Sequence, residues 1–324
     1  MMNIIVDTLG SDLGSGPIVA AIKTFINKNS DINIIAVGNK EELSSLEGLC
    51  EIVHAPDVVP MEAGPLEVMR MKNSSMYVAS SLMKERKADA IVSAGSTGGF
   101  LSCATLLLKT APNVKRAALV APFPTKIKGK KVVILDIGAS NENSPEELVQ
   151  FAFMGELYSK AIFGVEKPKI YLLSNGTEAG KGSPSGKQAY KLLQNKEGFM
   201  GNIEARNALS GEADVIVTDG FTGNIFLKSS EGMAKMMSGM MKSAFKKNLW
   251  SKLGYLHVKK GINEMVETMD YKSTGGAMLL GINGVVVKAH GNSDEYSFGC
   301  ALEVARKLAL SNINQKISEG LSNE

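Results

Sequence analysis

The sequence predicts an α/β fold in which a mostly parallel sheet carries helices on both faces. Short apolar runs rich in valine and isoleucine recur along the 324 residues. Their nearly continuous apolar character suits strands that are buried on both faces, as in parallel sheets. Helix-like segments separate the runs, and this alternation is typical of a doubly wound α/β architecture.

The expected elements follow one another in chain order. Strands are expected at residues 3–6, 33–37, 90–93, 132–135, 170–173, 215–218 and 285–288. Helices are expected between them, at residues 17–27, 75–85, 145–159 and 187–193. Residues 232–268 look helical throughout and are too long for an ordinary crossover, which indicates an inserted helical element. No repeat or linker divides the chain, so residues 1–324 are predicted to form a single domain that contains this insertion.

Composition excludes several classes of protein. The chain has 36 basic and 33 acidic residues, a formal net charge of +3, and only 6% aromatic residues, which argues against a nucleic-acid binder. Three cysteines without a C-x-x-C pattern and three scattered histidines predict neither a disulfide framework nor a metal site. The sequence also lacks a signal-peptide pattern and any run of 18 apolar residues. A cytosolic protein without a cofactor is the expectation.

Glycine-rich turns follow four of the expected strands. In open α/β sheets, ligands bind outside the carboxyl ends of strands, where glycine admits an anion and helix N-termini present free N–H groups. We therefore expect the four turns to face one cleft that binds phosphate or another oxyanion. Any one such turn is more often a tight turn with a helix cap, and His290 fits either role. The turns span residues 93–99, 136–141, 219–224 and 289–294.

The aspartates at the strand ends and one loop lysine each have two interpretations. Asp7, Asp136 and Asp219 would ligate a cation or, as the pattern favours, serve as turn and cap residues. Lys181 lies between two glycines in a loop after a strand, where its ammonium group either reaches a ligand or is solvated. Cys103 lies in an apolar helical run and is expected in the core. The absence of G-x-G-x-x-G and of a complete P-loop means that nucleotide binding is not indicated.

Residues 232–262 carry seven lysines and no acidic residue. Methionines at positions 233, 236, 237, 240 and 241 continue onto Phe245 along one face of a helix. Leu249, Trp250, Leu253 and Leu256 follow, and a basic amphipathic helix with Trp and Leu is suited to a membrane interface. The pattern alone slightly favours a dimer-interface or core helix with a solvated lysine face, and an acidic protein partner fits the same charges.

Several short motifs occur in a characteristic order along the chain. They are D-T-L-G-S-D at 7–12, S-A-G-S-T-G at 93–98, L-D-I-G-A at 135–139, P-E-E-L-V-Q at 145–150, G-N-I-E-A-R at 201–206, D-G-F-T-G-N at 219–224 and K-A-H-G at 288–291, with the residues at 271–276 in addition. Through these motifs the chain resembles the bacterial phosphate acyltransferase family of phospholipid synthesis, the PlsX family, over residues 3–317.

The resemblance implies a fold and a reaction. The fold is an α/β/α sandwich like that of isocitrate dehydrogenases and phosphotransacetylases, with a helical projection and a homodimeric assembly. In the reaction, an acyl group moves from acyl carrier protein to inorganic phosphate. The acyl phosphate then passes to a downstream membrane acyltransferase. The resemblance also implies peripheral attachment to an anionic membrane through the insertion at residues 232–268. The side chains expected to contact lipid are Leu249, Trp250, Leu253 and Leu256.

The resemblance also suggests roles for individual residues. Lys181 and Asn224 are the expected catalytic residues: Lys181 compensates charge, and Asn224 with Thr222 orients the thioester or donates to its oxyanion. Phosphate and substrate binding is expected from Gly95, Ser96, Thr97, Gly98, Ser140 and His290. Two alternatives stay open. One is a phosphotransacetylase-like enzyme that uses an acyl-CoA thioester. The other is a non-catalytic membrane or carrier-protein scaffold, since the family usually has asparagine where this chain has Ser96 and another sequence at residues 139–142.

Overall fold

A computed structural model describes residues 1–269 and 275–322. Their strands form one sheet with the order β3-β2-β1-β4-β11-β10-β5-β6-β9-β7-β8. Most of the 271–276 motif lies outside the described residues. The strands are β1 (Met2–Asp7), β2 (Ile32–Gly38), β3 (Glu51–His54), β4 (Ala90–Ser93), β5 (Ala118–Pro124), β6 (Lys131–Leu135), β7 (Ile170–Ser174), β8 (Phe199–Glu204), β9 (Val215–Val217), β10 (Ala277–Leu280) and β11 (Val285–Lys288).

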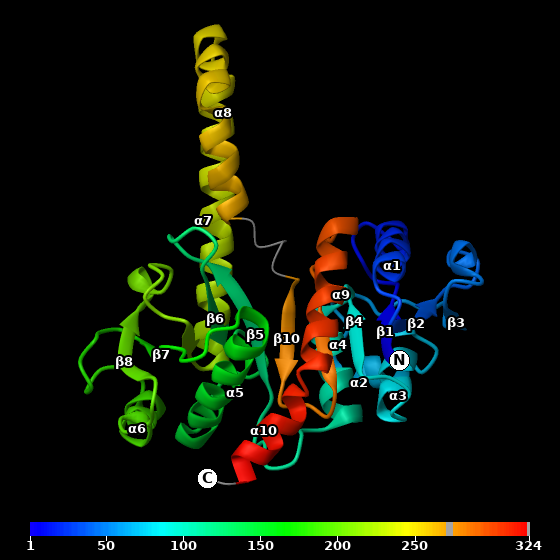
Figure 1. Cartoon of the computed structure of the whole chain (residues 1–324), viewed down its shortest axis with the longest axis horizontal. Coiled ribbons are helices and arrows are strands. Elements are labelled where there is room, and N and C mark those ends of the chain that lie inside the picture. The colour runs from blue at the N-terminus through cyan, green and yellow to red at the C-terminus, as the bar shows by residue number, and fades with distance from the viewer. Residues whose placement is uncertain (270–274, 323–324) are drawn as a thin grey trace.

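Helices cover both faces of the sheet, as the sequence predicts (Figure 1). Side chains of α1, α5, α6, α9 and α10 pack on one face, and those of α2, α3, α4 and the first turns of α7 pack on the other. The helices are α1 (Gly16–Lys28), α2 (Pro65–Arg70), α3 (Ser75–Lys84), α4 (Thr97–Cys103), α5 (Pro145–Phe163), α6 (Pro184–Leu193), α7 (Gly220–Lys246), α8 (Leu249–Met269), α9 (Glu295–Leu310) and α10 (Ile313–Ser322).

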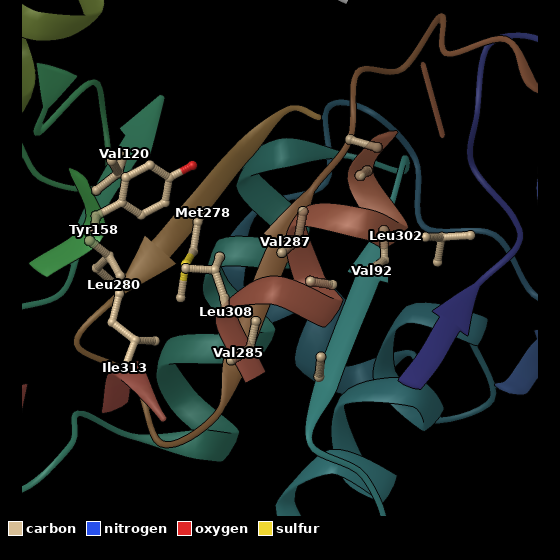
Figure 2. Close-up of a cluster of buried hydrophobic side chains, with 14 of the residues drawn as sticks. Val92, Val120, Tyr158, Met278, Leu280, Val285, Val287, Leu302, Leu308 and Ile313 are labelled. Atoms are coloured by element: carbon tan, nitrogen blue, oxygen red, sulfur yellow. The ribbon is translucent and has the colours of Figure 1, made fainter. Parts of the chain in front are cut away.

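The largest core lies beneath α9 and α10. Figure 2 shows Val92, Val285 and Val287, from neighbouring strands, beside Leu302 and Leu308 of α9. All are at most 3% exposed. Each buried aliphatic side chain contributes roughly 1.5–3 kcal/mol of burial free energy, so this contact fixes α9 against the strands whose ends carry two of the glycine turns.

Two strands that the sequence analysis did not foresee reverse the direction of the sheet. β10 pairs antiparallel with both β11 and β5, and β5 pairs antiparallel with β6. The other neighbouring pairs are parallel. As a result, β1, β4 and β11 run in one direction, and β6, β9, β7 and β8 run in the opposite direction. The carboxyl ends of these two groups of strands therefore point to opposite edges of the sheet.

Residues 232–268 form the outer part of α7 and most of α8. These two helices lie against each other and extend away from the sheet (Figure 1). The rings of Phe245 and Tyr255 pack across the pair, with centroids 5.2 Å apart. No helix within the described residues is long and apolar enough to cross a membrane. Because α7 begins at Gly220, the projection is continuous with a helix that starts in one of the glycine turns.

Candidate active site

The four glycine turns form two clusters. Reversal of the sheet separates the turns after β4 and β11 from those after β6 and β9, so the prediction that all four face one cleft from one edge is wrong. We name the clusters by one residue each. The Lys288 cluster comprises Asp7, Ser93, Ser96, Lys288 and His290, and the Asn224 cluster comprises Asp136, Gly138, Ser140, Thr222 and Asn224.

The Lys288 cluster is built on three adjacent strand ends. Asp7, Ser93 and Lys288 are register partners across β1, β4 and β11, so their side chains share one face of the sheet. The Ser93 hydroxyl donates to Asp7 Oδ2 at 2.6 Å. Lys288 Nζ donates to the backbone carbonyl of Ala289. Ser93 thus bonds to Asp7, and Lys288 bonds to the backbone.

Both charged groups of this ladder are buried. Asp7 is fully buried and Lys288 is 7% exposed. Burial lowers the pKa of Lys288 to about 8, although the carboxylates of Asp7 and Asp12 act in the opposite direction. Burial also raises the pKa of Asp7, opposed by hydrogen bonds from Ser75 and Ser93. The ladder therefore carries an unfavourable desolvation that its internal contacts offset only in part.

The predicted phosphate-binding residues of this cluster have mostly structural contacts. The Ser96 hydroxyl caps α4 by accepting from the Gly99 N–H at 3.3 Å, and it donates to the Met61 carbonyl at 3.2 Å. Ser96 is buried, whereas Thr97 and Gly98 are exposed. Gly95 is buried beneath them, and His290 is half-buried just after β11.

In the Asn224 cluster, Asp136 organises the turn after β6. Its Oδ1 accepts the backbone N–H groups of Leu119, Gly138 and Ala139 at 2.8–3.0 Å. Its Oδ2 accepts the N–H and the hydroxyl of Ser140 at 2.9 and 2.7 Å. Burial raises the pKa of Asp136, with the Ala139 and Ser140 bonds opposing it. The turn role that the sequence favoured for Asp136 is confirmed.

The start of α7 packs directly on this turn. An added Cβ at Gly223 would collide with the Asp136 carbonyl, so only glycine allows the helix to approach so closely. Asn224 then lies beside Gly138: a Cβ added at Gly138 would be 3.4 Å from Asn224 Cγ. Asn224 is exposed, and its side-chain amide has no hydrogen-bond partner among the described residues. Its donor is thus available to a substrate at the N-terminus of a long helix.

Thr222 and Asp219 form the cap of α7. Asp219 Oδ1 accepts the Thr222 N–H at 2.8 Å, and Asp219 Oδ2 accepts the Thr222 hydroxyl at 3.0 Å. The cap role that the sequence favoured for Asp219 is confirmed. The hydroxyl of Thr222 is directed to this cap, which leaves Asn224 as the clearer candidate for contact with a substrate.

Lys181 lies near the residues that precede α7. It is exposed and lines a small, partly open cavity together with Thr218 and Asp219. Asp219 is thus shared between the Lys181 cavity and the cap of α7. The structure brings Lys181 close to the start of α7, and it does not bring Lys181 to the Ser96 turn.

The two clusters still border one continuous layer of side chains. Leu101 of α4 and Ala139 of the turn after β6 each pack against both cores on this face of the sheet. Cys103 is buried there, as expected. In the described part of the chain, no group of three or more His, Cys, Asp or Glu side chains is arranged to hold a metal ion.

Two polar residues of these regions were not singled out from the sequence. Lys288 ends an otherwise apolar run, V-V-V-K, and a charge at the end of a buried strand is a signal that could have found it. Ser174 ends β7 and lines the Lys181 cavity. A serine at a strand end is too common for its sequence position to indicate a site.

Solved structures share this architecture. The phosphotransacetylase of Streptococcus pyogenes matches with a TM-score of 0.63 and 18% identity, covering 95% of this chain and 94% of that chain. A branched-chain phosphotransacylase from Enterococcus faecalis V583 gives a TM-score of 0.60 and 16% identity, covering 95% and 99%. At such identities the likeness concerns the fold alone. The chain is an α/β protein with the phosphotransacetylase-like fold.

Sequence relatives define the family. A protein named Phosphate acyltransferase from Exiguobacterium sp. is 41% identical over 98% of both chains. Its namesake from Thermosipho melanesiensis is 39% identical and covers 100% of this chain and 97% of that protein. The family described as Fatty acid synthesis protein matches residues 2–316. The chain belongs to the phosphate acyltransferase family of enzymes, and the resemblance seen in the motifs is confirmed.

Proposed function

We propose that the chain transfers a fatty acyl group from an acyl carrier protein thioester to inorganic phosphate, and that the acyl phosphate supplies phospholipid synthesis. The observation that carries the proposal is the Asn224 cluster. Its Asn224 amide belongs to the first turns of α7, and Lys181 lines a cavity together with Asp219, the N-cap of that helix. Acyl transfer to phosphate needs both a donor for an oxyanion and a positive charge for the phosphate.

The reaction proceeds by direct attack. A phosphate oxygen forms a bond to the thioester carbonyl carbon, and the carbon–sulfur bond then breaks. The proton of hydrogen phosphate ends on the departing thiolate, so the products are an acyl phosphate and the free carrier thiol. Asn224 donates to the oxyanion of the tetrahedral intermediate, and Lys181 compensates the charge of phosphate. Phosphate is itself the nucleophile, so the chain need supply none.

The decisive experiment compares acyl donors. The protein is incubated with a long-chain acyl carrier protein, with and without phosphate, and both free carrier thiol and acyl phosphate are measured. Phosphate-dependent release of both products supports the proposal. Equal or faster turnover of an acyl-CoA would instead identify a phosphotransacetylase-like enzyme. Binding of the carrier protein without turnover of any donor would identify a scaffold.

The helical projection supports the proposed attachment to an anionic membrane. Trp250 is 82% exposed at the start of α8, and Leu249, Leu253 and Leu256 are exposed beside it. The seven lysines of residues 232–262 are also exposed. Each lysine near an anionic surface contributes about 1 kcal/mol, and the apolar side chains add burial at the acyl boundary. The protein would thus be cytoplasmic and peripherally attached, near a membrane acyltransferase that consumes its product.

Vesicle sedimentation tests this attachment. Binding should require phosphatidylglycerol, weaken with salt, and fall in a Trp250→Glu, Leu253→Glu variant. Leu66→Glu is the matched control, because Leu66 is 73% exposed on α2, outside the projection. Binding that is insensitive to salt, or an equal loss in the control, would contradict the proposal.

The exposed methionines of α7 support a homodimer. Met233, Met236, Met237 and Met240 leave an exposed apolar face along α7 in the single chain. A second copy covering this face would remove it from water. Sedimentation velocity should report a dimer for the wild type and a shift toward monomer for Met236→Glu. A monomeric wild type would refute the dimer.

A further inference from the structure

The Lys181 cavity is polar and small. It lies between the ends of β7 and β9 and the loop that leads into α6, and it is partly open to solvent. Its enclosed volume is only about 20 Å³, so it suits a small group bound at its mouth and not a nucleotide or an acyl chain. The residues of its lining that matter here are Ser174, Lys181, Gly182, Ser183 and Asp219.

Ser174 has a hydroxyl that nothing in the fold uses. The oxygen is buried and has no hydrogen-bond partner in the part of the chain that the structure describes. Buried polar groups are nearly always paired, and leaving one unpaired is unfavourable by about 1–3 kcal/mol. Rotation about the Cα–Cβ bond would turn this hydroxyl toward a ligand in the cavity that Ser174 lines.

Gly182 leaves room beside this hydroxyl. Its φ of +103° is one that residues with a side chain rarely adopt, and an added Cβ would lie 3.1 Å from Ser174 Oγ. A larger residue would therefore close over the serine. The Gly182 N–H is fixed by the Asn175 side chain at 2.9 Å, which holds the loop in place.

The hydrogen-bond donors around the cavity suit an anion. Among the described residues that line it, Lys181 is the one cation and Asp219 the one anion, so their formal charges cancel. Both oxygens of the Asp219 carboxylate accept hydrogen bonds from Thr222, which engages them in the cap of α7. The N-terminus of α6 also borders the cavity, where Ser183 caps the Gly186 N–H at 3.1 Å. This helix end adds partial positive charge and further backbone donors.

We infer that the Lys181 cavity is the inorganic phosphate site of the acyl transfer, with the Ser174 hydroxyl and the Lys181 ammonium as ligands. This inference rests on the proposed function for its reaction, and it moves phosphate away from the turn at residues 93–98. The buried hydroxyl gains its missing partner when phosphate binds.

The test compares two serines whose buried hydroxyl groups both have no hydrogen-bond partner among the described residues. Ser159 of α5 also has a buried hydroxyl without a partner among the described residues, and it does not line the cavity. Ser174→Ala should raise the KM for phosphate by about 10-fold or more, because a hydrogen bond to a charged group is lost, and leave the KM for the acyl donor unchanged. Ser159→Ala should change neither constant.

A second measurement is independent of catalysis. Inorganic phosphate, with chloride at equal ionic strength as reference, should raise the melting temperature of the wild type and of Ser159→Ala, but not of Ser174→Ala. If the wild type turns over no acyl donor yet keeps this pattern, the proposed function fails and the phosphate site stands. An unchanged phosphate KM in Ser174→Ala, a larger effect in Ser96→Ala, or no stabilisation of the wild type by phosphate would overturn the inference.

Discussion

The Lys288 and Asn224 clusters use similar residues at strand ends for different purposes. In the Lys288 cluster Asp7, Ser93 and Lys288 are buried and bond to one another or to the backbone. In the Asn224 cluster a buried carboxylate holds the backbone, while Asn224 is exposed, as is Lys181. The comparison teaches that a polar side chain in a glycine turn can serve a ligand only where the fold itself does not already use it.

Removing the carboxylate of Asp136 should have the largest effect on stability. Asp136→Ala leaves the N–H groups of Leu119, Gly138 and Ala139 without their acceptor. At about 1–3 kcal/mol for each donor left unpaired, the free energy of unfolding should fall by about 3 kcal/mol or more. Urea unfolding measures this loss.

Asp136→Asn provides the control for this prediction. The amide keeps the shape of the side chain and one acceptor oxygen, so its loss of stability should be clearly smaller. Equal stability of the wild type and Asp136→Ala would show that the turn does not depend on this carboxylate, and would remove the organising role assigned to Asp136.

Lys181→Ala and Asn224→Ala should each lower the phosphate-dependent rate by about 10²-fold, the usual effect of losing one group that stabilises transition-state charge. The fold should be retained, since both side chains are exposed. Steady-state kinetics with circular dichroism as a check on folding measures both. Lys187→Ala, an exposed lysine of α6 outside the cavity lining, should keep the wild-type rate. A variant of Lys181 or Asn224 with near-normal turnover would remove that residue from the mechanism.

Sequence reasoning found most of the parallel strands, though not β3 and β8, and it missed the two strands that set their direction. Continuous apolar runs such as V-V-I-L at residues 132–135 indicate buried strands directly. β5 ends in P-F-P, where proline weakens the strand signal, and β10 is only four residues long. Because these two strands pair antiparallel with their neighbours, missing them hid the reversal of the sheet.

The failure to predict β5 and β10 also limited the prediction of the site. The motifs put Asn224, Lys181 and Ser140 in segments that follow strands, and the structure has them there, because turn chemistry is local. Which turns share an edge depends on strand order and direction, which are properties of the whole sheet. Whether a hydroxyl caps a helix or faces a ligand, as for Ser96 and Ser174, depends on packing between distant segments.

The burial of Lys288 should appear in the pH dependence of stability. Its pKa is about 8 in the folded protein and near the ordinary value of 10.5 when unfolded. Between these values the unfolded chain binds more protons, so stability due to this group rises with pH. The wild type should gain up to about 1.4 kcal/mol for each pH unit in this window relative to Lys288→Met. If the free energies of unfolding of the wild type and of Lys288→Met differed by the same amount at all pH values, this would contradict the burial of a charged lysine.

The smallest effect is expected at Ser96, because the resemblance and the structure give this residue different roles. The resemblance assigns Ser96 to phosphate binding, whereas its hydroxyl accepts from the Gly99 N–H and donates to the Met61 carbonyl. Ser96→Ala should therefore lower the free energy of unfolding by about 1 kcal/mol, the usual effect of losing a helix cap. Ser96→Asn, which keeps a capping oxygen and can still donate to the Met61 carbonyl, should recover most of this stability. If Ser96→Ala instead retains its stability and abolishes phosphate-dependent turnover, this hydroxyl binds an anion, and the division between an internally bonded cluster and a ligand-binding cluster does not hold.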